Sequence, residues 1–67
     1  MTNTDALKNL IAQRGLKISY ICRETGICRT SLWKKINGMT EFKTSEVAKM
    51  SEILGLKKRE VDSIFFS

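Results

Sequence analysis

Apolar residues recur three or four positions apart in five stretches of the chain, and glycines separate these stretches. This spacing is typical of helices that bury one face. We therefore expect helices over about 5–14, 18–25, 29–37, 45–54 and 58–65. The glycines expected to end the first four are Gly15, Gly26, Gly38 and Gly55. Proline is absent and strict alternation is scarce, so the pattern predicts a compact five-helix, all-α domain over residues 1–67.

The same spacing defines the candidate core and two candidate helix caps. The side chains expected to face inward are Leu7, Leu10, Ile11, Ile18, Ile21, Cys22, Leu32, Ile36, Val47, Met50, either Ile53 or Leu54, Val61, Ile64 and Phe65. Phe42, which precedes the fourth helix, is expected to join this core. Thr4 and Thr44 stand at the starts of the first and fourth helices, where a threonine hydroxyl is a good N-cap.

The distribution of charge adds a functional hint. The chain has 12 Lys and Arg against 7 Asp and Glu, a net charge of +5. Residues 14–43 contain seven of the basic residues and only two acidic ones, so the whole surplus lies in this central segment. A folded domain that concentrates cations in this way usually faces a polyanion. A solvated basic surface that serves only solubility is the alternative interpretation.

Other classes of protein are disfavoured by what the sequence lacks. The chain has no histidine, the commonest general base and metal ligand, so we expect no enzyme, no metal site and no cofactor. Two cysteines do not make a disulfide framework. No apolar run approaches the length of a membrane span, and the first residues do not resemble a signal peptide. These features predict a cytoplasmic protein without a membrane partner.

The segment 17–37 carries the most specific pattern. Two short predicted helices are separated only by Gly26, Ile27 and Cys28, which leaves room for one tight turn. Cys22 is a small residue where the two helices would approach each other, and Leu32 would help to fix their crossing angle. A small residue, a glycine and apolar residues at these offsets are typical of a helix-turn-helix.

The chain resembles a known family at these residues. Gly26 to Gly38 reads GICRTSLWKKING, followed by Thr-Glu-Phe at 40–42 and Ser-Glu-Val at 45–47. Together with the ending at 61–66, these motifs resemble the lambda-repressor-like helix-turn-helix domains of phage Cro and repressor proteins, above all small Cro-like regulators. The resemblance covers nearly the whole chain. It implies a transcriptional regulator, most simply a repressor, that binds a palindromic operator in double-stranded DNA.

The resemblance also assigns roles to individual residues. In this family the third helix is the recognition helix, which lies in the major groove. The positions that would contact bases are Arg29, Thr30 and Lys34. The positions that would contact the DNA backbone are Lys17, Ile18, Ser31, Trp33, Lys35, Asn37 and Lys43.

Three positions depart from the family pattern. Ile18 stands where the family often has Gln, and Cys28 where it often has a Ser or Thr cap. Lys35 stands where many members have an apolar residue, and we expect its stem to run along the surface toward a phosphate. A thiol at a helix N-terminus is expected to have a lowered pKa, but no resolving partner for a redox role of Cys28 is evident.

The expected assembly is a weak or DNA-dependent homodimer, because two-fold operators match two-fold proteins. The candidate interface is Val61, Ile64, Phe65 and Phe66, although part of this cluster must also fill the core. The alternative function is a protein-interaction module of the same fold, such as an antirepressor that binds another repressor. Trp33 favours that alternative, whereas the cationic residues around it favour DNA.

Overall fold

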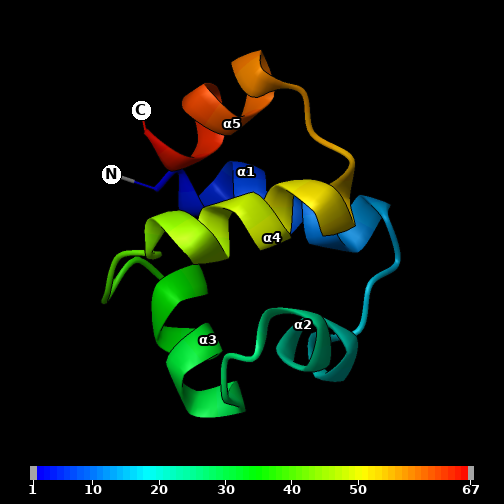
Figure 1. Cartoon of the computed structure of the whole chain (residues 1–67), viewed down its shortest axis with the longest axis vertical. Helices are drawn as coiled ribbons and strands as arrows, with labels where there is room; N and C mark the ends of the chain where they lie inside the picture. The colour runs from blue at the N-terminus through cyan, green and yellow to red at the C-terminus, as the bar shows by residue number, and fades with distance from the viewer. Residues whose placement is uncertain (1, 67) are drawn as a thin grey trace.

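The computed structural model describes residues 2–66, and these residues form five helices without any strand (Figure 1). The helices are α1 (Thr4–Gln13), α2 (Ile18–Thr25), α3 (Arg29–Ile36), α4 (Thr44–Leu54) and α5 (Lys58–Phe65). Each one lies within one residue of the range that the apolar spacing predicts. The all-α, five-helix prediction is therefore confirmed. Within residues 2–66, no helix is long and apolar enough to cross a membrane.

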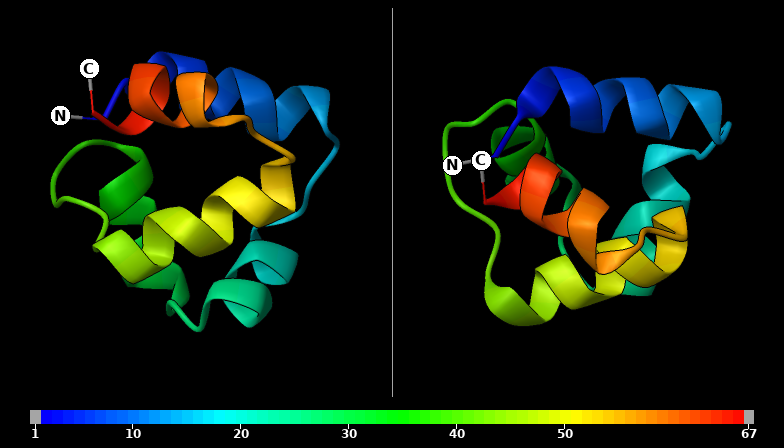
Figure 2. Two further views of the ribbon diagram at one scale, coloured as in Figure 1. Left: turned by 45° about the horizontal axis from the view of Figure 1, so that its top comes forward. Right: turned by 90° about the horizontal axis from the view of Figure 1, so that it is seen from above.

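The helices pack around one hydrophobic core to which every helix contributes. Its buried side chains are Leu7, Ile11, Ile21, Ile27, Leu32, Ile36, Val47, Met50, Leu54, Ile64 and Phe65. Helix α4 crosses the middle of the molecule, with α5 on one side of it and α2 and α3 on the other (Figure 1). The start of α1 lies beside the end of α5 (Figure 2), where the Asn3 N–H donates to the Ile64 carbonyl at 2.6 Å.

Most of the predicted core is confirmed, and one member is wrong. Ile18 is 36% exposed, because it is the first residue of α2 and lines a hollow that opens to the surface. Leu54 fills the position for which Ile53 was the alternative, and is 1% exposed. Phe42 packs against the core edge-on to Phe65, with ring centroids 5.3 Å apart.

The predicted threonine caps are also wrong. Asn3 caps α1 instead of Thr4, because its side-chain Oδ1 accepts from the Ala6 N–H at 3.2 Å. Thr44 is the first residue of α4, and Glu46 accepts from the N–H of the residue before it, Lys43, at 2.8 Å. Glu46 thus makes the carboxylate half of a capping box, which satisfies the N–H of the N-cap residue and not a first-turn amide.

Helices α2 and α3 are joined by the three-residue turn that the sequence predicts. Gly26 ends α2 with φ 75° and ψ 11°, a left-handed conformation that other residues adopt at a cost. The next residue, Ile27, is buried, and its N–H donates to Thr25 Oγ1 at 3.3 Å. The turn is therefore anchored to the core at its centre, which fixes how α3 leaves α2.

Helix α3 is held against α4 as well. Leu32 and Ile36 are buried in the core on one face of α3. Lys35 lies on the same face, and its ammonium forms an ion pair with Glu46 of α4. Residues at these spacings share a helix face, so the opposite face of α3 is left to solvent.

Candidate nucleic-acid interface

The exposed face of α3 carries all three residues for which base contacts were predicted. Arg29, Thr30 and Lys34 are exposed, and so is Trp33, at 56%. Arg29 and Thr30 form the first turn of the helix and Lys34 follows one turn later. The structure therefore gathers these residues on one accessible surface, which we call the α3 face (Arg29, Thr30, Trp33 and Lys34).

The start of α2 lies beside the α3 face. Ile18 of α2 and Arg29, Trp33 and Ile36 of α3 line a hollow of about 250 Å³, which we call the Ile18–Trp33 hollow. Lys17, immediately before Ile18, is exposed. Two of the predicted backbone-contacting residues thus border the surface formed by the predicted base-contacting ones.

Two further backbone-contacting candidates serve α3 itself. Ser31 is half-buried, and its Oγ accepts from the Cys28 thiol at 3.1 Å. Asn37 is half-buried as well, and its Nδ2 donates to the Trp33 carbonyl at 2.8 Å. These contacts support the two ends of the helix. Lys43 is exposed in the segment that precedes α4.

Lys35 is the candidate that the structure removes from the DNA-contacting set. We expected its stem to run over the surface toward a phosphate, but its side chain is only 11% exposed and its ammonium pairs with Glu46. The ion pair directs this side chain toward α4 instead of along the surface. Lys35 occupies a position that is apolar in many members of the family it resembles, so the sequence did contain a signal that it faces inward.

Glu46 is the partner that sequence reasoning missed. Burial of its carboxyl raises the pKa, but hydrogen bonds from Lys35 and from the Lys43 N–H, together with both ammonium charges, outweigh burial and hold the pKa below its usual range. The Glu46 carboxyl therefore stays ionised at neutral pH. Its ion pair with Lys35 fixes the last turn of α3 against the first turn of α4.

Cys28 has a chemically distinct environment at the start of α3. The Ser31 hydroxyl and the backbone N–H groups of the first turn can donate to its thiolate, and these hydrogen bonds lower its pKa. The direction agrees with the sequence-based expectation. Cys22, the other cysteine, is half-buried against the core.

The N-termini of α2 and α3 differ from the others in how their amides are used. Neither helix has a side-chain cap, whereas Asn3 caps α1 and glutamates accept at the starts of α4 and α5. Both uncapped termini lie within the basic segment 14–43. Helix-start N–H groups that no protein group accepts favour anions, and this applies to α2, since at α3 the Thr30 and Ser31 N–H groups face the Cys28 sulfur.

The predicted dimer interface is mostly core. Ile64 and Phe65 are 6% and 3% exposed, so they contribute almost no surface to a partner, and their assignment to an interface is corrected. Val61 is half-buried and Phe66 is 61% exposed. Of the four predicted residues, Phe66 is the main one that a second molecule could contact.

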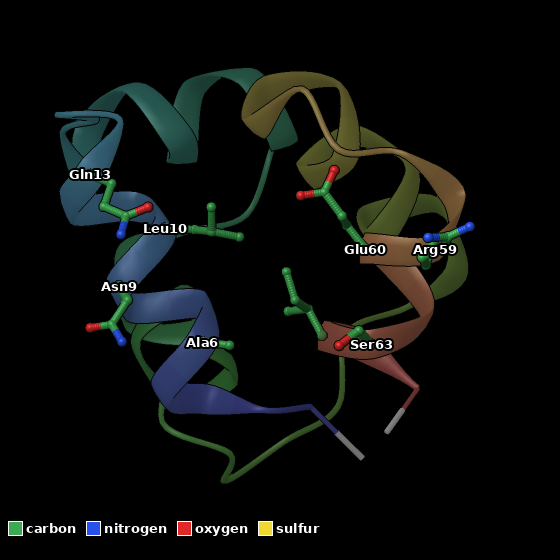
Figure 3. A pocket seen from close by; sticks show the side chains of 8 residues that line it. Ala6, Asn9, Leu10, Gln13, Arg59, Glu60 and Ser63 are labelled. Carbon is green, nitrogen blue, oxygen red and sulfur yellow. The ribbon is translucent and has the colours of Figure 1, made fainter.

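A separate hollow of about 450 Å³ lies between α1 and α5 (Figure 3). Leu10 projects into it from α1, and Glu60 and Ser63 border it from α5. Its mixed apolar and polar lining contains no group of residues suited to a metal ion, and the structure contains no such group anywhere in residues 2–66.

Comparison of the chain with protein-family models, with curated proteins and with solved structures finds no match.

Proposed function

We propose that this protein is a sequence-specific transcriptional regulator that binds double-stranded DNA through a lambda-repressor-like helix-turn-helix formed by α2 and α3. The supporting observation is the α3 face. Arginine, threonine and lysine are exposed on a helix whose other face is anchored by Leu32, Ile36 and the Lys35–Glu46 pair. A rigidly held cationic helix is what major-groove reading requires.

The diameter of an α-helix suits the groove. With its side chains a helix is about 10–12 Å across, and the major groove of B-DNA is about 12 Å wide and admits one helix. In this proposal Arg29 donates two hydrogen bonds to guanine O6 and N7. Thr30 contacts a neighbouring base, and Lys34 reaches a base or a phosphate one turn further on.

The charges around α3 support backbone contacts. Within residues 2–66, Lys17, Arg29 and Lys34 have no ion-pair partner, so their charges are available to phosphates. The uncapped amides of α2 add donors beside them. Arg23 is less available, since it lies 3.8 Å from Glu24.

Operator binding would involve two copies. One helix of eight residues reads only a few base pairs, and a palindromic site presents two equivalent halves about 34 Å apart. The small apolar area around Phe66 predicts a dimer that is weak in solution and forms on DNA. We propose repression by occupancy, in which the bound protein excludes polymerase from the promoter.

The test begins with selection of binding sites from a random duplex library. We expect an enriched sequence that binds at least about 10³-fold more tightly than scrambled DNA. Arg29→Ala should lose about 1–3 kcal/mol on the selected site and little on scrambled DNA. Arg59→Ala, an exposed arginine on α5, is the matched control and should behave as wild type. Failure to enrich any sequence would refute the proposal.

One observation favours a second function. Ile18 and Trp33 are large apolar residues exposed beside the cationic side chains, and exposed aromatics often mark protein-binding surfaces. An interaction module of this fold, such as an antirepressor, would use the same surface to bind another repressor. If this second function is correct, the selection experiment should enrich no DNA sequence. In a separate binding assay with a repressor, Trp33→Ala should lose affinity for that repressor.

A further inference from the structure

The Ile18–Trp33 hollow is an apolar site within a cationic surface. Ile18 and Trp33 are 36% and 56% exposed, while Ile36, at 7%, is the buried member of its lining. Arg29 completes the lining and Lys17 lies next to Ile18 in the chain. The family that the sequence resembles often has Gln at the position of Ile18, so this apolar wall is a property of this chain.

We infer that this hollow binds the 5-methyl group of a thymine, and that Ile18 and Trp33 thereby determine part of the DNA sequence that the protein prefers. The inference rests on the proposed function. The thymine methyl is the one apolar group that base pairs present in the major groove. A hollow with apolar walls and a guanidinium at its edge matches that methyl beside a hydrogen-bonding base.

Helix geometry sets the distance between the two contacts. Arg29 and Trp33 are four residues apart, so they lie on one face with a rise of about 6 Å between them. Successive base pairs are separated by about 3.4 Å along the DNA axis. The thymine bound at Trp33 therefore lies one or two base pairs from the guanine bound at Arg29.

The charge of the surface selects DNA as the occupant. Lys17, Arg29 and Lys34 surround the apolar walls without an acidic partner among the described residues. An apolar protein segment would have to approach past these cations, whereas phosphates flank every thymine in a duplex. The attraction between these opposite charges favours a nucleotide methyl over an uncharged peptide.

The experiment replaces each thymine of the selected site by deoxyuridine, which removes only the 5-methyl group. For the wild type we expect one position per half-site, one or two base pairs from a guanine, at which affinity falls about fourfold. That factor corresponds to about 0.8 kcal/mol for one buried carbon group. Trp33→Ala and Ile18→Ala should each bind thymine and deoxyuridine duplexes almost equally.

Tyr20→Ala is the matched control, because Tyr20 is an exposed aromatic of α2 that does not line the hollow. It should keep the wild-type preference for thymine. Circular dichroism establishes that each variant is folded, and the Ile18 variant provides an independent test if Trp33→Ala is not.

The possible results separate the two proposals. A selected sequence with no methyl-sensitive thymine near a guanine overturns the inference and leaves DNA binding intact. So does a thymine preference that persists in both Ile18→Ala and Trp33→Ala. Failure to select any sequence overturns the proposed function, and the inference with it.

Discussion

The ion pair between Lys35 and Glu46 should stabilise the protein through the contact of α3 with α4. To measure it we would make Lys35→Met, Glu46→Gln and the double variant. Methionine keeps an unbranched stem of similar length in the same packing position. Glutamine keeps an oxygen that can accept from the Lys43 N–H, so the first turn of α4 retains its cap.

The expected magnitude follows from burial. Exposed ion pairs contribute at most about 1 kcal/mol, and breaking a fully buried one costs about 3–5 kcal/mol. The two side chains are 11% and 15% exposed, which lies near the buried limit. We expect Lys35→Met to lose about 2 kcal/mol, since it leaves a carboxylate without its cation. Glu46→Gln should lose about 1 kcal/mol because the hydrogen bonds persist.

The double variant should lose about 1 kcal/mol, because neither charge is then left unpaired. The two single losses together exceed this loss by about 2 kcal/mol, which is the coupling free energy between the two residues. A chain of 67 residues has a total stability of about 3–10 kcal/mol. A loss of 2 kcal/mol therefore lowers Tm by roughly 8–16 °C. Urea unfolding followed by far-ultraviolet circular dichroism measures all four proteins. Strictly additive losses would refute the argument that the two charges depend on each other.

Three further predictions concern local features. As pH falls, the free energy of unfolding should decrease more for the wild type than for Glu46→Gln, as measured by acid titration with circular dichroism. Because the pKa of Glu46 is lowered in the folded state, its contribution to stability is complete above its unfolded-state pKa of about 4.3. That contribution is lost as pH falls through the lower folded-state pKa. Gly26→Ala should lower the free energy of unfolding measured in urea by about 1–2 kcal/mol, because an alanine is strained at a φ of 75°. No steric clash adds to this loss, since no atom lies within 4 Å of the added Cβ. Ser31→Ala should raise the pKa of the Cys28 thiol toward its usual value, because it removes the hydroxyl that hydrogen-bonds to the sulfur. Alkylation of Cys28 near neutral pH should then be slower, with Cys22 as the internal reference. An unchanged rate would contradict the role of the hydroxyl.

The helices and most of the core could be predicted from the sequence because their signals are local. Gly26 marks the end of α2 because the left-handed backbone conformation there favours glycine. The spacing of apolar residues identifies the inward face of each helix. Ile18 shows the limit of such reasoning. Its apolar side chain fits the helical pattern, but only the packing of α2 against the other helices determines that Ile18 is left exposed while Ile21 is buried.

The caps and the charge pair could not be predicted because they depend on competition between neighbours or on distant partners. Asn3 and Thr4 are both good N-cap residues, and the contact of Asn3 with Ile64 of α5 favours the former. Lys35 and Glu46 are separated by eleven positions and a loop. Nothing in the spacing of either helix indicates that their side chains meet.

The buried face of α3 determines what its exposed face can do. Leu32, Lys35 and Ile36 face inward at spacings of three and four, so the same periodicity turns Arg29, Thr30, Trp33 and Lys34 outward. A lysine on the inward face would ordinarily loosen the helix, but Glu46 neutralises it and converts it into a second anchor on α4. The basic side chains of α3 therefore have different roles. One cation holds the helix in position, and the others remain on the surface where a phosphate backbone or a base edge could meet them.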